Sequence, residues 1–308
     1  MIDVNHRDSL TRCRRQPRGS THSNDQLSLA TKTDLQKSLS ASCMPFLKWA
    51  GGKRWLTHRI GSIVPSNYET YFEPFLGSAA LFFALRPASA ILGDLNSDLI
   101  STYVEVRENP IEVWDYLTLY QLQHSDEHYY AIRDSLLSDP AELAARFIYL
   151  NRTCWNGLYR VNRQGHFNVP RGSKSVALYD YEDPLQFCAN LKSAQLICSD
   201  FEMIVDCAGR NDLIFADPPY TVKHNYNGFL KYNESLFSWE DQERLAKALL
   251  RALRRGAFVV VSNADHKSIR DLYRRNFKLI PVKRASVLAA SPEFRSPTSE
   301  LLILGRPK

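Results

Sequence analysis

Short apolar runs and longer segments with helical spacing alternate along most of the chain. Apolar runs typical of buried strands lie at 71–75, 90–93, 194–198, 212–216 and 257–262. Helical spacing predicts helices at 78–85 and 239–254, the second preceded by a capping-box signature. A closing pair of apolar runs, 277–282 and 300–304, has no helix between its members and predicts an antiparallel edge. This alternation is typical of an α/β, doubly wound, Rossmann-like sheet.

The middle of the chain loses this rhythm. Polar and aromatic segments with helical spacing predict helices at 111–122, 129–137 and 141–150, and a stretch rich in Asn, Gly and Arg follows them. The pattern indicates a mostly helical module, residues 97–180, inserted into a sheet domain that comprises residues 44–96 and 181–308.

Residues 1–43 differ from the rest of the chain. They are rich in Ser, Thr, Arg and Gln, contain no aromatic residue and show no sustained apolar period. Such a segment cannot bury enough apolar surface to offset the entropy lost on ordering, so we expect a disordered N-terminal extension. It also lacks the apolar stretch of a secretory signal.

Composition and charge narrow the class of protein. The chain has 308 residues, of which 44% are hydrophobic, and a formal net charge of +6, which suits a polyanionic partner without proving one. Six scattered cysteines without a C-x-x-C pair predict neither a zinc site nor a disulfide framework, and we expect no metal. No apolar run approaches the ~20 residues needed to cross a bilayer. We therefore expect a cytoplasmic protein with no membrane contact.

Two segments near the start of the sheet domain suit a nucleoside ligand. The loop at 46–53 combines paired glycines with the flat face of Trp49 and the cation of Lys53. The segment 71–78 runs from a strand through a Gly-containing turn into a helix, where open α/β sheets bind nucleosides. Asp94 ends the next strand and is placed to accept hydrogen bonds from ribose hydroxyls; as a structural alternative it is a helix cap.

The sharpest motif is Asp217-Pro218-Pro219-Tyr220, at the end of a buried strand. Each proline fixes φ and removes a backbone donor, so the Asp217 carboxylate and neighbouring carbonyls present only acceptors. Two fixed acceptors would hold both hydrogens of an amino group and orient its nitrogen for in-line attack. Tyr220 offers a face on which a flipped base could stack. The structural alternative is a strand followed by a rigid proline turn.

The segments 151–162 and 166–170 have the composition of a nucleic-acid-reading hairpin. Asn156-Gly157 is a strong signal for a hairpin turn between two polar and aromatic arms. Arg160 suits a bidentate contact with guanine, and Leu158 could wedge into a base stack. The remaining candidate contacts in the hairpin are Asn156 and Asn162. The alternative is a surface hairpin whose basic residues have no such part.

These motifs, in this order, resemble the Dam family of DNA adenine-N6 methyltransferases over residues 44 to about 305. The resemblance implies a Rossmann-like sheet that binds S-adenosylmethionine, an inserted DNA-recognition domain at 97–180, and methyl transfer to N6 of adenine in duplex DNA without a metal. The implied cofactor contacts are Trp49, Lys53, Asp94 and Asp217, with Asp200 and Phe201 around the cofactor adenine. The implied catalytic residues are Asp217, Pro218, Pro219 and Tyr220. The implied DNA-reading positions are Leu158, Arg160 and Pro170.

The resemblance favours GATC as the recognition site and leaves alternatives open. N4 of cytosine presents the same amino donor, an RNA base is a further possible target, and a DNA-binding regulator that holds S-adenosylmethionine without turnover belongs to another class. The segment 221–238, with Lys223, His224 and Lys231, is expected to close over the flipped base. A restriction endonuclease that acts on the same site is a possible partner, without a stable complex.

Overall fold

The computed structural model describes residues 44–162, 164–222, 237–284 and 298–307. The expected N-terminal extension, residues 1–43, lies outside the described residues. So does most of the segment 221–238, including Lys223, His224 and Lys231.

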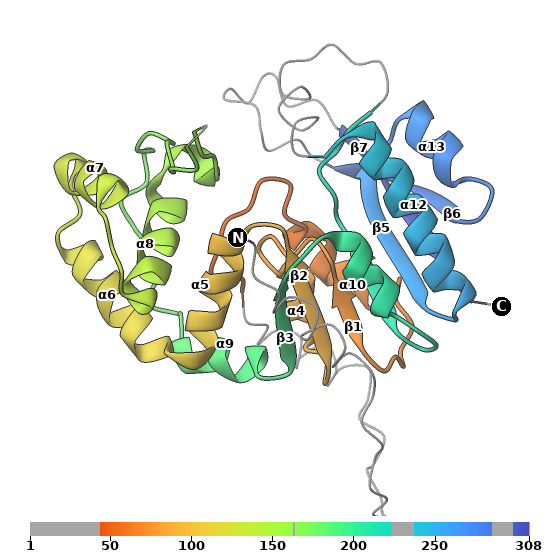
Figure 1. The fold of residues 1–308 in the computed structure, drawn as a ribbon, viewed down its shortest axis with the longest axis horizontal. Coiled ribbons are helices and arrows are strands. Elements are labelled where there is room, and N and C mark those ends of the chain that lie inside the picture. The colour runs from red at the N-terminus through yellow and green to blue at the C-terminus, as the bar shows by residue number, and fades with distance from the viewer. Residues whose placement is uncertain (1–43, 163, 223–236, 285–297, 308) are drawn as a thin grey trace, which may run out of the picture. The chain divides into compact units, whose positions relative to one another are not determined.

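A seven-stranded sheet forms the centre of the fold (Figure 1). Its strands are β1 (Tyr71–Glu73), β2 (Ala90–Asp94), β3 (Ala194–Cys198), β4 (Leu213–Ala216), β5 (Phe258–Ala264), β6 (Lys278–Arg284) and β7 (Thr298–Gly305). Their spatial order is β3-β2-β1-β4-β5-β7-β6. The first five strands run parallel in the order of a doubly wound Rossmann sheet. The α/β, Rossmann-like prediction is confirmed.

The closing antiparallel pair is confirmed in direction, and its placement is more specific than predicted. β7 pairs with β5 on one side and with β6 on the other, both antiparallel, so β6 is the edge strand. The run Leu301–Ile303 is fully buried. A strand with neighbours on both sides and covered faces favours such a continuous apolar run.

Helices accompany the strands in the expected order. They are η1 (Arg54–Leu56), α3 (Thr57–Ile60), α4 (Ala80–Leu85), α5 (Ser97–Glu108), α6 (Pro110–Leu122), α7 (Asp126–Asp134), α8 (Pro140–Thr153), η2 (Trp155–Gly157), α9 (Pro184–Leu191), α10 (Phe201–Cys207), α12 (Trp239–Arg254) and α13 (Lys267–Tyr273). Ser238 and Asp241 form the predicted capping box of α12. α7 begins three residues before the predicted start because Ser125 accepts a hydrogen bond from the His128 backbone and caps the helix there.

The helical module and the sheet share one hydrophobic core. Phe46, just ahead of the first candidate loop, has its ring centroid 4.9 Å from that of Tyr103 in α5 and 5.2 Å from that of Phe187 in α9. Because the core is continuous, a domain boundary between residues 96 and 97 stays a prediction.

The predicted turn at Asn156-Gly157 is wrong as the tip of the hairpin. Both residues have the positive φ of a left-handed turn, 56° and 64°, but they lie in η2 and turn the chain out of α8. The arms pair further on, through a bridge between Val161 and Phe167, and the tip lies between them. Asn162 supports this tip, because its side-chain oxygen accepts hydrogen bonds from the backbone of Gln164 and His166.

Gly157 explains why the left-handed pair belongs at the end of α8. It is buried, and a Cβ at this position would lie 2.9 Å from the Cβ of Lys48. The missing side chain therefore allows the chain leaving α8 to pass closely over the candidate loop at 46–53, and a glycine also adopts the left-handed turn without strain. The close contact between Gly157 and Lys48 determines where this turn lies. The Asn-Gly pair alone does not show this, because Lys48 is distant in the sequence.

Candidate active site

The candidate motifs meet where the strand order of the sheet reverses. β1 and β4 are parallel neighbours, with Tyr71 opposite Leu213. The chain leaves β1 to one side, toward β2, and leaves β4 to the other, toward β5. Crevices at such switch points, outside the carboxyl ends of the strands, are the usual ligand sites of open α/β sheets. The segments that follow β1 and β4 begin with Pro74 and Asp217.

An ion pair joins the first candidate loop to the third motif. Lys53 Nζ lies 2.9 Å from Asp217 Oδ2, and the two side chains are 2% and 18% exposed. Lys53 Nζ also donates a hydrogen bond to the Gly51 carbonyl. The tight turn between Trp49 and Gly52, whose backbone groups hydrogen-bond at 3.0 Å, shapes this loop. Two segments more than 160 residues apart in sequence are therefore joined at one carboxylate.

Tyr220 is held by its hydroxyl group. The hydroxyl shares a hydrogen bond of 2.8 Å with Ser262 Oγ in β5 and donates to Glu300 Oε2 in β7 at 3.1 Å. Lys53 Nζ lies 5.1 Å from the centroid of the Tyr220 ring. Burial raises the pKa of Tyr220 well above its usual range, and the charges of Asp217 and Glu300 raise it further. The hydroxyl therefore stays protonated and acts as a donor.

The proline turn is also held by side chains of α12 and β5. Gln242 Nε2 of α12 donates to the Pro219 carbonyl at 3.2 Å, and Asn263 Nδ2 of β5 donates to Gln242 Oε1 at 3.0 Å. Both amide side chains are fully buried. This chain of hydrogen bonds, together with the rigid φ of the two prolines, restricts the motion of the turn.

Glu73 ends β1 beside this cluster and is only 3% exposed. The Tyr71 hydroxyl donates to its Oε2 at 3.0 Å. Burial raises the pKa of Glu73 well above its usual range, and the negative charge of Asp217 adds to the effect. Glu73 therefore holds its proton to higher pH than an exposed glutamate.

A second group of residues surrounds the turn after β1. Gly77 has φ 47°, and a Cβ there would lie 2.8 Å from Trp49 Cδ1. The Gly77 amide donates to Asp94 Oδ2 at 3.3 Å, and Asp94 Oδ1 accepts from the Asn96 amide at 3.1 Å. Burial raises the pKa of Asp94, and its backbone hydrogen bonds oppose the shift. Asn96, rather than Asp94, caps helix α5, so the helix-cap alternative for Asp94 does not hold.

Asp200 and Phe201 lie at the start of α10. Asp200 caps this helix and pairs with Arg244 Nη2 at 2.8 Å, and the Arg244 guanidinium lies 4.8 Å from the centroid of the Phe201 ring. Phe201 also stacks on Phe75 at 5.4 Å. The turn after β1 and the turn after β3 are thus joined by aromatic contact.

The candidate residues of the hairpin at 151–170 differ in their exposure and contacts. Arg160 is exposed, and its guanidinium donates to the side-chain and backbone oxygens of Asn168 across the hairpin at 2.8 and 3.3 Å. Leu158 is half-buried against the hydrophobic core, and Trp155 is 54% exposed. Pro170 is exposed, and its carbonyl accepts from the Trp155 amide at 2.9 Å.

Tyr159 connects this hairpin to the first candidate loop. Its ring stacks on Trp49, with centroids 5.9 Å apart and planes inclined by 20°, and its hydroxyl donates to Asp98 Oδ2 at 3.0 Å. Trp49 therefore lies between the turn at Gly77 and the hairpin. Several residues that contact the candidate motifs were not singled out from the sequence. They are Trp155, Tyr159, Gln242, Ser262, Asn263 and Glu300.

Comparison with known proteins identifies the family. The family described as D12 class N6 adenine-specific DNA methyltransferase matches residues 49–288. Type II methyltransferase M1.LlaDCHI of Lactococcus lactis is 35% identical over 87% of this chain and 97% of its own length. The DNA adenine methylases of Haemophilus influenzae and Escherichia coli K12 are each 32% identical, over 84% and 85% of this chain and 93% and 95% of their own lengths. The chain belongs to the D12 class of adenine-specific DNA methyltransferases.

A D12-class enzyme transfers the methyl group of S-adenosylmethionine, and the residues after β1 and β2 fit such a cofactor. Gly77 is a glycine because Trp49 occupies the space of a Cβ, so the indole lies directly on the turn. Asp94 presents a carboxylate at the end of β2, as ribose hydroxyls require. The prediction of the family and of the enzyme class is confirmed.

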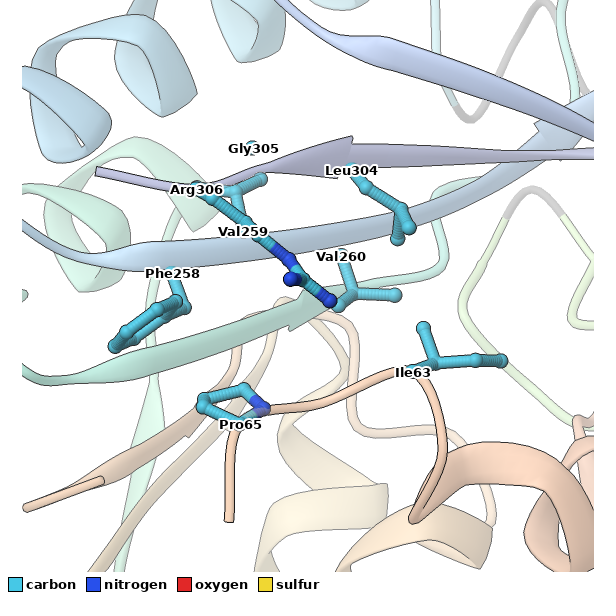
Figure 2. A pocket seen from close by; sticks show the side chains of 8 residues that line it. All are labelled: Ile63, Pro65, Phe258, Val259, Val260, Leu304, Gly305 and Arg306. Carbon is cyan, nitrogen blue, oxygen red and sulfur yellow. The ribbon is translucent and has the colours of Figure 1, made fainter. Parts of the chain in front are cut away.

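Three further findings concern the described parts of the chain as a whole. Within the described parts of the chain, no cluster of three or more His, Cys, Asp or Glu side chains could hold a metal ion. None of the helices in those parts is both long and apolar enough to cross a bilayer. A small apolar pocket is lined by Ile63, Pro65, Phe258, Val259, Val260, Leu304, Gly305 and Arg306 (Figure 2). It lies at the start of β5, away from the Ser262 end that faces the Asp217 turn.

Proposed function

We propose that this enzyme methylates N6 of adenine within GATC in duplex DNA, after the adenine has flipped out of the helix. The observation that carries the proposal is the ion pair between the buried Lys53 and the part-buried Asp217. Asp217 directly precedes two prolines, and the hydroxyl of the following Tyr220 is hydrogen-bonded to Glu300. A paired carboxylate in a rigid turn is the preorganised acceptor that an amino group of a base needs.

In this proposal the residues of the chain contribute to methyl transfer by orienting the target base. Asp217 and the Pro218 carbonyl accept the two hydrogens of N6, and the Tyr220 ring stacks on the base. S-adenosylmethionine, when bound, would supply the methyl group on its sulfonium. Trp49 against the turn after β1 and Asp94 at the end of β2 would hold it, with Lys53 and Asp217 beside them. Neither a metal nor a covalent intermediate with the enzyme is needed.

Recognition belongs to the hairpin in this proposal. Arg160 is exposed, and rotation away from Asn168 would let its guanidinium make a bidentate contact with a guanine edge. The other proposed DNA contacts are Asn156, Leu158, Asn162 and Pro170. GATC rests on the resemblance of this hairpin to that of the Dam family. We propose duplex DNA as the partner and a restriction endonuclease that acts on the same site as the counterpart, in line with the name of the Lactococcus relative.

The test is to express the chain in a host that lacks DNA methylation and to map modified bases across its DNA. The proposal expects N6-methyladenine at GATC. N6-methyladenine at another sequence would refute the GATC assignment alone, and N4-methylcytosine would refute the adenine target. If the DNA stays unmodified although the folded protein binds S-adenosylmethionine, the result would support a DNA-binding regulator that does not transfer the methyl group.

A further inference from the structure

Glu300 is a buried carboxylate that the motifs around Asp217 do not include. It is 6% exposed and lies on β7, opposite Ala264 near the carboxyl end of β5. The antiparallel pairing of β7 with β5 therefore carries Glu300 to the same end of the sheet as the turn after β4. No sequence motif connects Glu300 with this turn, since Tyr220 and Glu300 are 80 residues apart.

One oxygen of Glu300 interacts with both Tyr220 and Lys53, the two side chains described above around Asp217. Oε2 accepts from the Tyr220 hydroxyl at 3.1 Å and lies 3.8 Å from Lys53 Nζ. Ser262 Oγ donates to the same oxygen at 3.4 Å. Lys53 is thus shared between two carboxylates, with Asp217 the closer at 2.9 Å.

A buried carboxylate is costly, and an apolar residue of similar volume is often equally or more stabilising at such a site. Stability alone therefore does not favour a glutamate here. What the carboxylate provides is geometry, because it fixes the tilt of the Tyr220 ring through its hydroxyl and the direction of the Lys53 ammonium. Displacement of a catalytic group by about 1 Å can reduce a rate by ~100-fold.

We propose that Glu300 is a positioning residue for methyl transfer, which holds Tyr220 against the target base and Lys53 against Asp217. This inference rests on the proposed catalytic role of the Asp217–Tyr220 turn. It assigns a function to strand β7, which lies between β5 and β6. The strand completes the sheet and also supplies the side chain that anchors the proposed catalytic turn.

The test compares Glu300→Gln, Tyr220→Phe and the double variant with the unmodified protein. Glu300→Gln keeps the shape and removes the charge, so kcat is expected to fall about tenfold or more, because a charge-assisted hydrogen bond becomes a weaker neutral one. KM for DNA is expected to stay within about threefold, because recognition of the site is proposed to belong to the hairpin and not to Glu300. Loss of the Tyr220 hydroxyl should then cost less in the Glu300→Gln background than alone.

Ser299→Ala is the matched control. Ser299 is the neighbour of Glu300 on β7 and donates to an acidic side chain, Asp265, at 2.7 Å. Its side chain is exposed, so its loss should leave kcat within about twofold. If Glu300→Gln is too unstable to assay, Ser262→Ala removes another partner of the Tyr220 hydroxyl and is expected to lower kcat by a smaller factor without changing KM.

A second readout does not need methyl transfer. With 2-aminopurine in place of the target adenine, emission reports how closely the flipped base stacks, and Glu300→Gln should raise it because the Tyr220 ring is held less tightly. Unchanged kcat and emission in Glu300→Gln, or losses that simply add in the double variant, would overturn the role of Glu300. Methylation of cytosine in place of adenine by the unmodified protein would instead overturn the proposed function, and the kcat values of the same variants on cytosine would then decide on Glu300.

Discussion

Individual residues in this protein differ in how far the neighbouring sequence predicts their contacts in the fold. Asp217 lies at the end of a strand and before two prolines, and in the fold it is paired with Lys53 at 2.9 Å. Arg160 lies in an exposed arm, hydrogen-bonded to Asn168. Glu73 is buried at the end of β1. Each leads to a different measurement.

Asp217→Ala is expected to remove activity and leave the fold intact. Loss of one acceptor preorganised for the transition state costs ~10²–10³ in rate. The measurement is transfer of labelled methyl groups into duplex DNA, with cofactor binding followed by calorimetry. Asp206→Ala, which removes an exposed acid that pairs with Arg251, is the control and should stay active. An Asp217→Ala rate within a few-fold of the unmodified rate would exclude Asp217 from the chemistry.

Arg160→Ala is expected to lose discrimination at one base pair and to keep its cofactor affinity. A bidentate contact between arginine and guanine is worth ~1–3 kcal/mol, or about five- to 150-fold in preference. Methylation of GATC is compared with that of sites substituted one position at a time. Asn168→Ala, which removes the partner of Arg160 in the hairpin, should alter preference less. Equal loss on all sites would indicate a phosphate contact instead.

Glu73→Gln is expected to reduce the pH dependence of stability. The pKa of Glu73 is raised in the folded state by burial, so the folded chain binds more protons than the unfolded chain above about pH 4. Stability from this group is complete below the unfolded pKa and is lost as pH rises toward the folded pKa. Urea unfolding at about pH 6 and about pH 8 should show a smaller decline in the free energy of unfolding for the variant than for the unmodified protein. Equal declines would show that Glu73 ionises as it does in the unfolded chain.

At the scale of elements, the hairpin at 151–170 and the loop at 46–53 are in direct contact. Tyr159 stacks on Trp49, and Asn151 at the end of α8 both accepts from the Lys48 amide and donates to the Lys48 carbonyl, each at 2.8 Å. The loop that bears Trp49 and Lys53 is thus held by the helix and hairpin of the inserted module.

Tyr159→Ala is therefore expected to weaken cofactor binding without changing site preference. An aromatic pair contributes ~0.5–1.5 kcal/mol, which corresponds to about a two- to twelvefold loss of affinity. Calorimetric titration with S-adenosylmethionine measures it. Tyr181→Ala is the matched control, since Tyr181 is exposed and stacks on Tyr179 at 5.3 Å, outside the hairpin. Unchanged affinity in Tyr159→Ala would show that Trp49 keeps its place without the stack.

At the scale of the whole described molecule, one buried arginine joins distant segments. Arg152 in α8 is 1% exposed, pairs with Glu182 at 2.6 Å, and donates to the carbonyls of Phe46 and Ala177. The start of the sheet domain, the helical module and the chain returning to the sheet thus converge on one guanidinium. Its five donors in a planar fork suit such a junction better than a lysine would.

Arg152→Met is expected to cost ~3–5 kcal/mol in the free energy of unfolding, because it leaves the buried Glu182 carboxylate without its cation. The double variant with Glu182→Leu should recover part of this loss. Arg133→Ala, which breaks an exposed ion pair with Asp134, is expected to cost less than ~1 kcal/mol. Urea unfolding measures all three, and equal losses for Arg152→Met and Arg133→Ala would contradict a junction role.

The sequence by itself determined the strands, most helices and the Asp217-Pro-Pro-Tyr220 turn, because apolar period, capping residues and proline act within a few neighbouring residues. It also determined the family, whose motifs are local. Only the tertiary structure decided that β7 enters between β5 and β6, that the hairpin tip lies beyond Asn156-Gly157, and that Glu300 reaches Tyr220. Pairing between strands, packing against Lys48 and shared hydrogen bonds depend on residues far apart in the chain, and no local pattern encodes which distant partners meet.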